Sequence, residues 1–193
     1  MPDLSLRFEG PFHLVGRAEE NVFGSSQIKC SGIYLFAIDT AERGTVVRYV
    51  GETGVSFEKR LKEHIIQILG GNYRISGVES MQEMSEEVLW DGLWRRERTG
   101  MIQDFIEQYV ELAPLIKDYL NAYRIFLAPV PPLELDQRQR RLVEGALARH
   151  FKDHDNLIAP DIRYLSRKRD EESFRVSITT AAPVVGLPHL LTV

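Results

Sequence analysis

The sequence predicts an α/β (α+β) domain in which a small mixed or antiparallel sheet carries helices on its faces. Two runs of β-forming residues flank a short turn, and apolar residues at helical spacing follow them. A long helical insert then precedes a third strand and a well-capped helix. This order of strand, strand, helix, insert, strand and helix is typical of sheets covered by helices.

The first two strands form a predicted hairpin. Residues 33–38 have the sequence IYLFAI, a continuous apolar run that predicts a buried strand. Residues 45–50, TVVRYV, predict a second strand, and residues 39–44 form the turn between them. Because this connection is short, we expect the two strands to pair antiparallel.

The first helix is predicted over residues 57–69. Ser56 is a suitable N-cap, and Gly70 and Gly71 end the helix. Apolar residues recur at helical spacing on one face. Arg60 and His64 are four residues apart, so we expect them to lie one above the other beside that face.

The second half of the chain holds the insert, a third strand and a second capped helix. Residues 72–98 are acidic and predicted to be irregular, and residues 101–120 are amphipathic, with Pro114 expected to kink or split the helix. Residues 123–130, YRIFLAPV, predict the third strand. Asp136, with Gln139 three positions later, predicts a capping box for a helix that reaches about Phe151.

Weaker patterns lie near the two ends. Residues 12–15 predict a short strand, and residues 174–179 alternate as a late edge strand does. We expect one domain over residues 1–193, divided into a core of about 30–70 and 122–160, a helical insert at 72–121, an N-terminal extension at 1–29 and a C-terminal tail at 161–193.

Composition limits the classes of function. The net charge of −4 counts against DNA binding, because phosphate contacts usually need a basic surface. The charge is uneven, however: residues 138–169 hold nine Lys or Arg against four Asp or Glu, whereas residues 79–118 hold ten acidic residues against four basic ones. A positive and a negative face can therefore coexist, although ordinary solvated helices would give the same pattern.

Cysteine content and hydropathy predict a cytoplasmic protein. Cys30 is the single cysteine, which excludes an internal disulfide and does not favour a structural zinc site. The first residues lack the pattern of a signal peptide. No apolar run approaches the roughly 18 residues that cross a membrane, so we expect no membrane partner.

Two short motifs and a helix resemble the GIY-YIG nuclease family. Gly32-Ile33-Tyr34 opens the first strand, and Tyr49-Val50-Gly51 closes the second, with valine where the family motif has isoleucine. Arg60 and His64 follow on the next helix. The resemblance covers about residues 30–66 and, more weakly, 122–160. It implies a small three-stranded antiparallel sheet flanked by helices, with a helical insertion in this chain.

The resemblance also implies roles for individual residues. A helical glutamate holds one divalent metal in the family, and Glu144 lies where it is expected, with Asn156 as the downstream asparagine. Arg60 would contact the scissile phosphate. Tyr34 and Tyr49 would orient water and phosphate, and the general base is either Tyr34 or His64. A phenol has a pKa near 10, so Tyr34 would need a nearby cation to act as a base.

The physical chemistry of phosphodiester hydrolysis is compatible with this set. Mg²⁺ or Mn²⁺ activates a water and stabilises charge on phosphate, and a hard cation that keeps several waters needs few carboxylates. Each residue also has an ordinary interpretation: Glu144 could pair with Arg140 or Arg141, Arg60 could form a surface salt bridge, and both tyrosines could be core aromatics. Glu52 lies near the site or caps the turn. Basic residues that could line a DNA groove are Lys59, Lys62, Arg138, Arg141, Arg163, Arg167 and Lys168.

The function predicted from these features is that of a metal-dependent DNA endonuclease. A standalone unit with a helical insert resembles the type II restriction enzymes, which suggests a homodimer on double-stranded DNA. A structure-specific repair nuclease is an alternative. Another is a DNA- or protein-binding module that keeps the scaffold but has weak or lost catalysis, which the acidic insert favours. A chance resemblance predicts that Tyr34, Tyr49, Arg60 and Glu144 do not meet in space.

Overall fold

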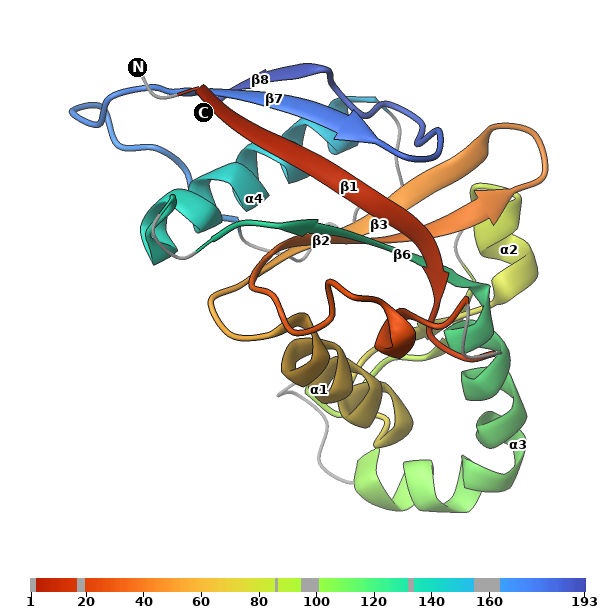
Figure 1. Ribbon diagram of the computed structural model, residues 1–193. Coiled ribbons are helices and arrows are strands. Elements are labelled where there is room, and N and C mark those ends of the chain that lie inside the picture. The colour runs from red at the N-terminus through yellow and green to blue at the C-terminus, as the bar shows by residue number, and fades with distance from the viewer. Residues whose placement is uncertain (1–2, 17–19, 86, 95–100, 132–133, 155–163) are drawn as a thin grey trace.

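The computed structural model describes residues 3–16, 20–85, 87–94, 101–131, 134–154 and 164–193. Within these ranges the chain forms a curled, mixed six-stranded sheet, a two-stranded sheet and helices on both sides of the central strands (Figure 1). The main sheet has the strand order β3-β2-β6-β1-β7-β8. Its strands are β1 (Asp3–His13), β2 (Gly32–Thr40), β3 (Gly44–Thr53), β6 (Tyr123–Pro129), β7 (Arg175–Thr180) and β8 (Leu190–Thr192).

The remaining elements cover this sheet. The helices are η1 (Val22–Gly24), α1 (Phe57–Leu69), α2 (Val78–Gln82), α3 (Met101–Ala122) and α4 (Gln137–Asp153), and the small sheet pairs β4 (Ile75–Ser76) with β5 (Val88–Trp90). Residues 72–98 were expected to be irregular, and that expectation is wrong where β4, α2 and β5 form. Pro114 lies inside α3, which continues as one helix but bends along its length (Figure 1).

The expected three-stranded sheet is wrong. The three predicted strands are present as β3, β2 and β6, and they pair antiparallel as expected. However, β1 pairs with the free edge of β6, and β7 then pairs parallel to β1. The physical reason is that β1 satisfies the backbone hydrogen-bonding groups along the free edge of β6, β7 does the same for β1, and both add buried residues such as Leu6 and Val176 to a shared core. Nor is β7 an edge strand, because β8 pairs with its outer side.

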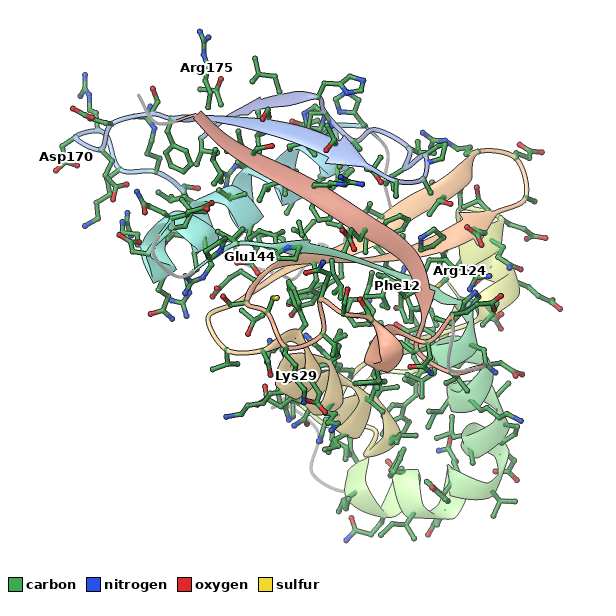
Figure 2. The ribbon with its side chains drawn as sticks, in the orientation of Figure 1. Phe12, Lys29, Arg124, Glu144, Asp170 and Arg175 are labelled. Carbon is green, nitrogen blue, oxygen red and sulfur yellow. The ribbon has the colours of Figure 1, made fainter. Side chains whose placement is uncertain are left out.

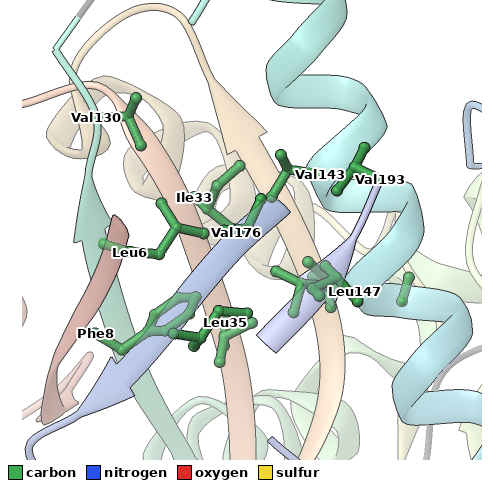
Figure 3. Packing of buried hydrophobic residues seen from close by; sticks show 14 of the residues in the cluster. Leu6, Phe8, Ile33, Leu35, Val130, Val143, Leu147, Val176 and Val193 are labelled. Atoms are coloured by element: carbon green, nitrogen blue, oxygen red, sulfur yellow. The ribbon is translucent and has the colours of Figure 1, made fainter. Parts of the chain in front are cut away.

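The strand β2 is continuously apolar because both of its faces are buried. Ile33, Leu35 and Ala37 pack into the α4-side core, which also contains residues of β1, β7, β8 and α4 (Figure 3). Tyr34, Phe36 and Ile38 point the other way, into the α1-side core formed with α1, α3 and the small sheet. One run of residues 33–38 therefore supplies both cores.

Two helices are fixed by local signals that the sequence already contains. Ser56 caps α1, with its hydroxyl accepting from the backbone N–H of Lys59. Asp136 and Gln139 form the expected capping box at the start of α4. These caps set where each helix begins, and hence which of its side chains face the sheet.

The strand β1 is predicted to be essential for stability. Leu6 is fully buried in the α4-side core, whereas the neighbouring Ser5 is exposed. Leu6→Ala should lower the free energy of unfolding by about 2–5 kcal/mol, because it removes buried methyl groups and leaves a cavity. Ser5→Ala should change it by less than about 0.5 kcal/mol. Urea denaturation followed by circular dichroism measures both, and equal stabilities would contradict the burial of Leu6 in the core.

Candidate active site

Tyr34 occupies a space that exists only because residue 51 is glycine. Tyr34 on β2 lies opposite Gly51 on β3 and is fully buried. A β-carbon on Gly51 would lie 2.2 Å from Cζ of Tyr34. Gly32 has a φ of +151°, and a β-carbon there would lie 2.2 Å from the carbonyl oxygen of Ala128 on β6. Both motif glycines therefore allow close approaches that any side chain would prevent.

The hydroxyl of Tyr34 is held by the two polar side chains expected on α1. It shares a hydrogen bond of 2.8 Å with Nε2 of His64, and Nε of Arg60 donates to it at 3.2 Å. Arg60 also donates from Nη1 to Oε2 of Glu63 at 3.2 Å. Arg60 thus forms the salt bridge expected of a surface arginine and, in addition, contacts the buried tyrosine.

Tyr49 completes an aromatic cluster around His64. Its ring centroid lies 6.0 Å from that of Tyr34 and 5.4 Å from the imidazole of His64. Tyr49 is paired directly with Phe36, and a bulge after that pair leaves Arg48 as an extra residue in β3. The register between the Tyr34–Gly51 and Phe36–Tyr49 pairs is regular, so the alternation of side chains along the strands places Tyr49 on the same face of the sheet as Tyr34.

Glu144 joins this cluster from α4 and lies between α4 and α1 in the view of Figure 2. Its Oε1 accepts a hydrogen bond of 3.2 Å from the backbone N–H of Glu52, at the end of β3. The carboxylate of Glu52 in turn accepts from Nε of Arg140 at 3.3 Å and from Nε of Arg141 at 3.4 Å. The two arginines that were candidate partners of Glu144 therefore pair with Glu52.

Burial is the largest cause of the pKa shifts of Glu144, His64, Tyr34 and Tyr49. Burial and then the nearby Glu52 carboxylate raise the pKa of Glu144 to about 7. Burial lowers the pKa of His64 to about 3, and the Arg60 cation acts in the same direction, so the imidazole is neutral at pH 7. Burial also raises the pKa of Tyr34 well above its usual value and that of Tyr49 above it, despite Arg60. The cation needed for a phenolate base must therefore be supplied by something other than Arg60.

Tyr164 was missed by the sequence analysis. Its hydroxyl donates to the carbonyl oxygen of Val50 at 3.4 Å, and burial, followed by Tyr49 and Glu144, raises its pKa. The chain around Leu165 can lie against α4 because residue 145 is glycine. A β-carbon on Gly145 would lie 2.2 Å from the carbonyl oxygen of Leu165. A glycine inside a predicted helix was the signal for this close approach.

Most of the candidate DNA-binding residues that the structure describes make local contacts with one of three glutamates. Lys62 pairs with Glu58 on α1 at 2.8 Å. Arg138 pairs with Glu171, whose backbone carbonyl accepts from Arg167 and whose side chain accepts from the backbone N–H of Lys168. Arg141 pairs with Glu52, and Lys59 is exposed in the first turn of α1. Asn156 and Arg163 lie outside the described residues.

The donor set for a metal is small. No group of three or more His, Cys, Asp or Glu side chains suited to a metal occurs in the part of the chain that the structure describes. The carboxylate of Glu144 nevertheless lies near the carboxylate of Glu52 and has a raised pKa. A cation bound there would favour the ionised form of Glu144. This fits a hard cation held by one carboxylate and waters.

No helix among the described residues is both long and apolar enough to cross a membrane. The chain matches no family model, no curated protein and no solved structure.

The low pKa of His64 predicts acid sensitivity. The unfolded chain takes up a proton at this histidine below about pH 6.5, whereas the folded protein resists protonation until about pH 3. Stability should therefore fall as the pH drops through this window. The free energy of unfolding of the wild type, relative to His64→Gln, should decrease by about 2–3 kcal/mol between pH 7 and pH 4. Urea titrations at both pH values measure it, and parallel pH profiles would contradict a buried neutral His64.

Proposed function

We propose that the chain is a divalent-metal-dependent endonuclease that hydrolyses phosphodiester bonds in double-stranded DNA, as a restriction-type homodimer on the GIY-YIG plan. The main support is that the predicted site residues, which are far apart in the sequence, lie together in space. Tyr34 and Tyr49 from the hairpin and Arg60 and His64 from α1 form one contact cluster, and Glu144 from α4 interacts electrostatically with Tyr49 and Arg60. A chance resemblance predicts that these side chains lie apart.

Arg60 is suited to hold the phosphate. Its Nε is engaged by Tyr34 and its Nη1 by Glu63, and a guanidinium has five N–H donors in all. The guanidinium is therefore oriented while it keeps donors for phosphate oxygens. The partly exposed Tyr49 lies beside it, and its hydroxyl can orient a water or a phosphate oxygen. The buried hydroxyl of Tyr34, held by His64, positions Arg60.

Glu144 is the residue proposed to hold Mg²⁺ or Mn²⁺. When bound, the metal supplies Lewis acidity and lowers the pKa of a coordinated water. Glu52 keeps Glu144 in place through its backbone N–H, while its own carboxylate is engaged by Arg140 and Arg141. One carboxylate therefore anchors α4 to the hairpin, and the other is left to bind the cation.

The net charge of −4 and the local ion pairs of the basic residues support the alternative of a binding module without catalysis. A DNA cleavage assay distinguishes the proposed nuclease from the binding module. With Mg²⁺ or Mn²⁺ and plasmid DNA, wild type should cleave. Glu144→Gln and Arg60→Ala should lower the rate by about 100-fold or more, because each removes an interaction with the reacting phosphate or its metal.

Matched variants make this assay specific. Asp153→Asn neutralises an exposed carboxylate at the end of the same helix and should cleave as wild type does. Discrete fragments would support the restriction type, and a smear or a preference for branched DNA would support a repair-type nuclease. If wild type cleaves nothing, the binding module is favoured. If Asp153→Asn is as defective as Glu144→Gln, the assigned metal residue is wrong.

Metal binding should depend on pH through Glu144. A carboxylate must be deprotonated to bind a metal, and the pKa of Glu144 is about 7. The apparent affinity for Mn²⁺ should therefore rise about tenfold per pH unit below pH 7 and level off above it. Isothermal titration calorimetry at pH 5.5, 6.5 and 8 measures this, with Glu144→Gln as the control. Wild-type affinity that is flat with pH, or retained in the variant, would point to other ligands.

A further inference from the structure

A chain of aromatic contacts leads from the candidate active site to the surface. The imidazole of His64 lies 5.8 Å from the ring of Tyr73, and Tyr73 lies 5.3 Å from Trp94 in an edge-to-face contact. Trp94 is 62% exposed. Tyr73 also interacts electrostatically with Arg60 and Glu63. Tyr73 and Trp94, here called the aromatic ledge, therefore begin beside the proposed phosphate contact and end in solvent.

The backbone holds Trp94 in this exposed position. Its N–H donates to the carbonyl oxygen of Asn72 at 3.4 Å, and the N–H of Leu93 donates to that of Gly71 at 2.9 Å. Gly92 has a φ of +90°, and a β-carbon there would lie 2.8 Å from the carbonyl oxygen of Asn72. The turn therefore requires glycine, and it fixes where the segment lies.

The second tryptophan of the chain behaves differently. Trp90 is 7% exposed, packs against Phe105, and donates its indole N–H to the carbonyl oxygen of Gly71 at 2.7 Å. The same short segment thus buries one indole and presents the other. An exposed ring that packs edge-to-face on a neighbouring aromatic residue, which itself lies near an arginine, is a surface on which a flat partner can stack.

We propose that the aromatic ledge is a stacking site for an unpaired nucleobase of the substrate, next to the phosphate contacted by Arg60. The inference rests on the proposed function, since it assumes a nucleic-acid substrate. Aromatic side chains bind bases of any identity by stacking, and a nearby arginine engages the backbone. A base inside an intact duplex cannot expose its face, so the base belongs either to a single strand or to a distorted duplex from which it has been extruded.

Fluorescence and binding with Ca²⁺ in place of Mg²⁺ test this without cleavage, because Ca²⁺ is a hard cation that carboxylates also bind. The probes are an oligothymidylate strand, a duplex with a one-base bulge, and the same duplex with an abasic residue in the bulge. Binding of either base-bearing probe should quench wild-type fluorescence, and the quenching should be absent in Trp94→Phe, which retains Trp90. Trp94→Ala should weaken binding of that probe by about tenfold or more, and Trp94→Phe by less.

Controls separate stacking from a general loss of binding. Tyr109→Ala removes a half-exposed aromatic residue on α3 and should bind as wild type does. The abasic bulge should bind wild type and Trp94→Ala equally. Quenching by the single strand alone assigns the ledge to single-stranded substrate, and quenching by the bulge assigns it to an extruded base.

Three results overturn the inference. Equal affinity of wild type and Trp94→Ala for both base-bearing probes removes it, while nucleic-acid binding and the proposed cleavage stand. Failure of wild type to bind any probe removes it together with the proposed function. Loss of self-association in Trp94→Ala, measured by sedimentation with nucleic-acid binding unchanged, would assign the ledge to protein contact instead.

Discussion

A buried hydroxyl is the constraint on which the site depends. Tyr34 is fully buried, and a polar group without water must find partners inside the protein. Its partners are His64 and Arg60, which lie one turn apart on α1, and its ring fits only because Gly51 has no side chain. The positions of β2, β3 and α1 are therefore coupled, and a change at any of these four residues disturbs the other three.

Glu52 and Glu144, at the junction of the hairpin and α4, differ in role because Arg140 and Arg141 both pair with Glu52. Arg140 and Glu52 are 8% and 11% exposed, so their ion pair is largely removed from water and must stay paired to be tolerated. Arg141 adds a second contact to the same Glu52 carboxylate. Glu144, beside them, keeps a raised pKa instead. The two arginines therefore pair with Glu52 and anchor α4 to β3. A cation bound beside Glu144 would stabilise the ionised form of its carboxylate.

Local patterns were sufficient for some elements and not for the sheet as a whole. The hairpin, α1 and α4 follow from apolar runs and caps that lie within a few residues of one another. The parallel pairing of β1 with β7 joins opposite ends of the chain, and nothing in either segment alone specifies its partner. The same limit applies to the site. Tyr34, Tyr49, Arg60 and His64 lie on locally predicted elements, whereas the contacts of Glu52 and Tyr164 depend on how α4 crosses the hairpin.

The pKa values of the cluster indicate the order in which charges can be added to it. Burial raises the pKa of Tyr34, Tyr49 and Glu144 together, which means that each additional negative charge there is unfavourable despite Arg60. A phosphodiester brings a further negative charge, whereas a divalent cation opposes all three shifts. Electrostatics therefore favours entry of the cation before the phosphate or together with it. Under the proposed function, a metal held by Glu144 would therefore favour binding of the phosphodiester as well as supply the chemistry that activates water.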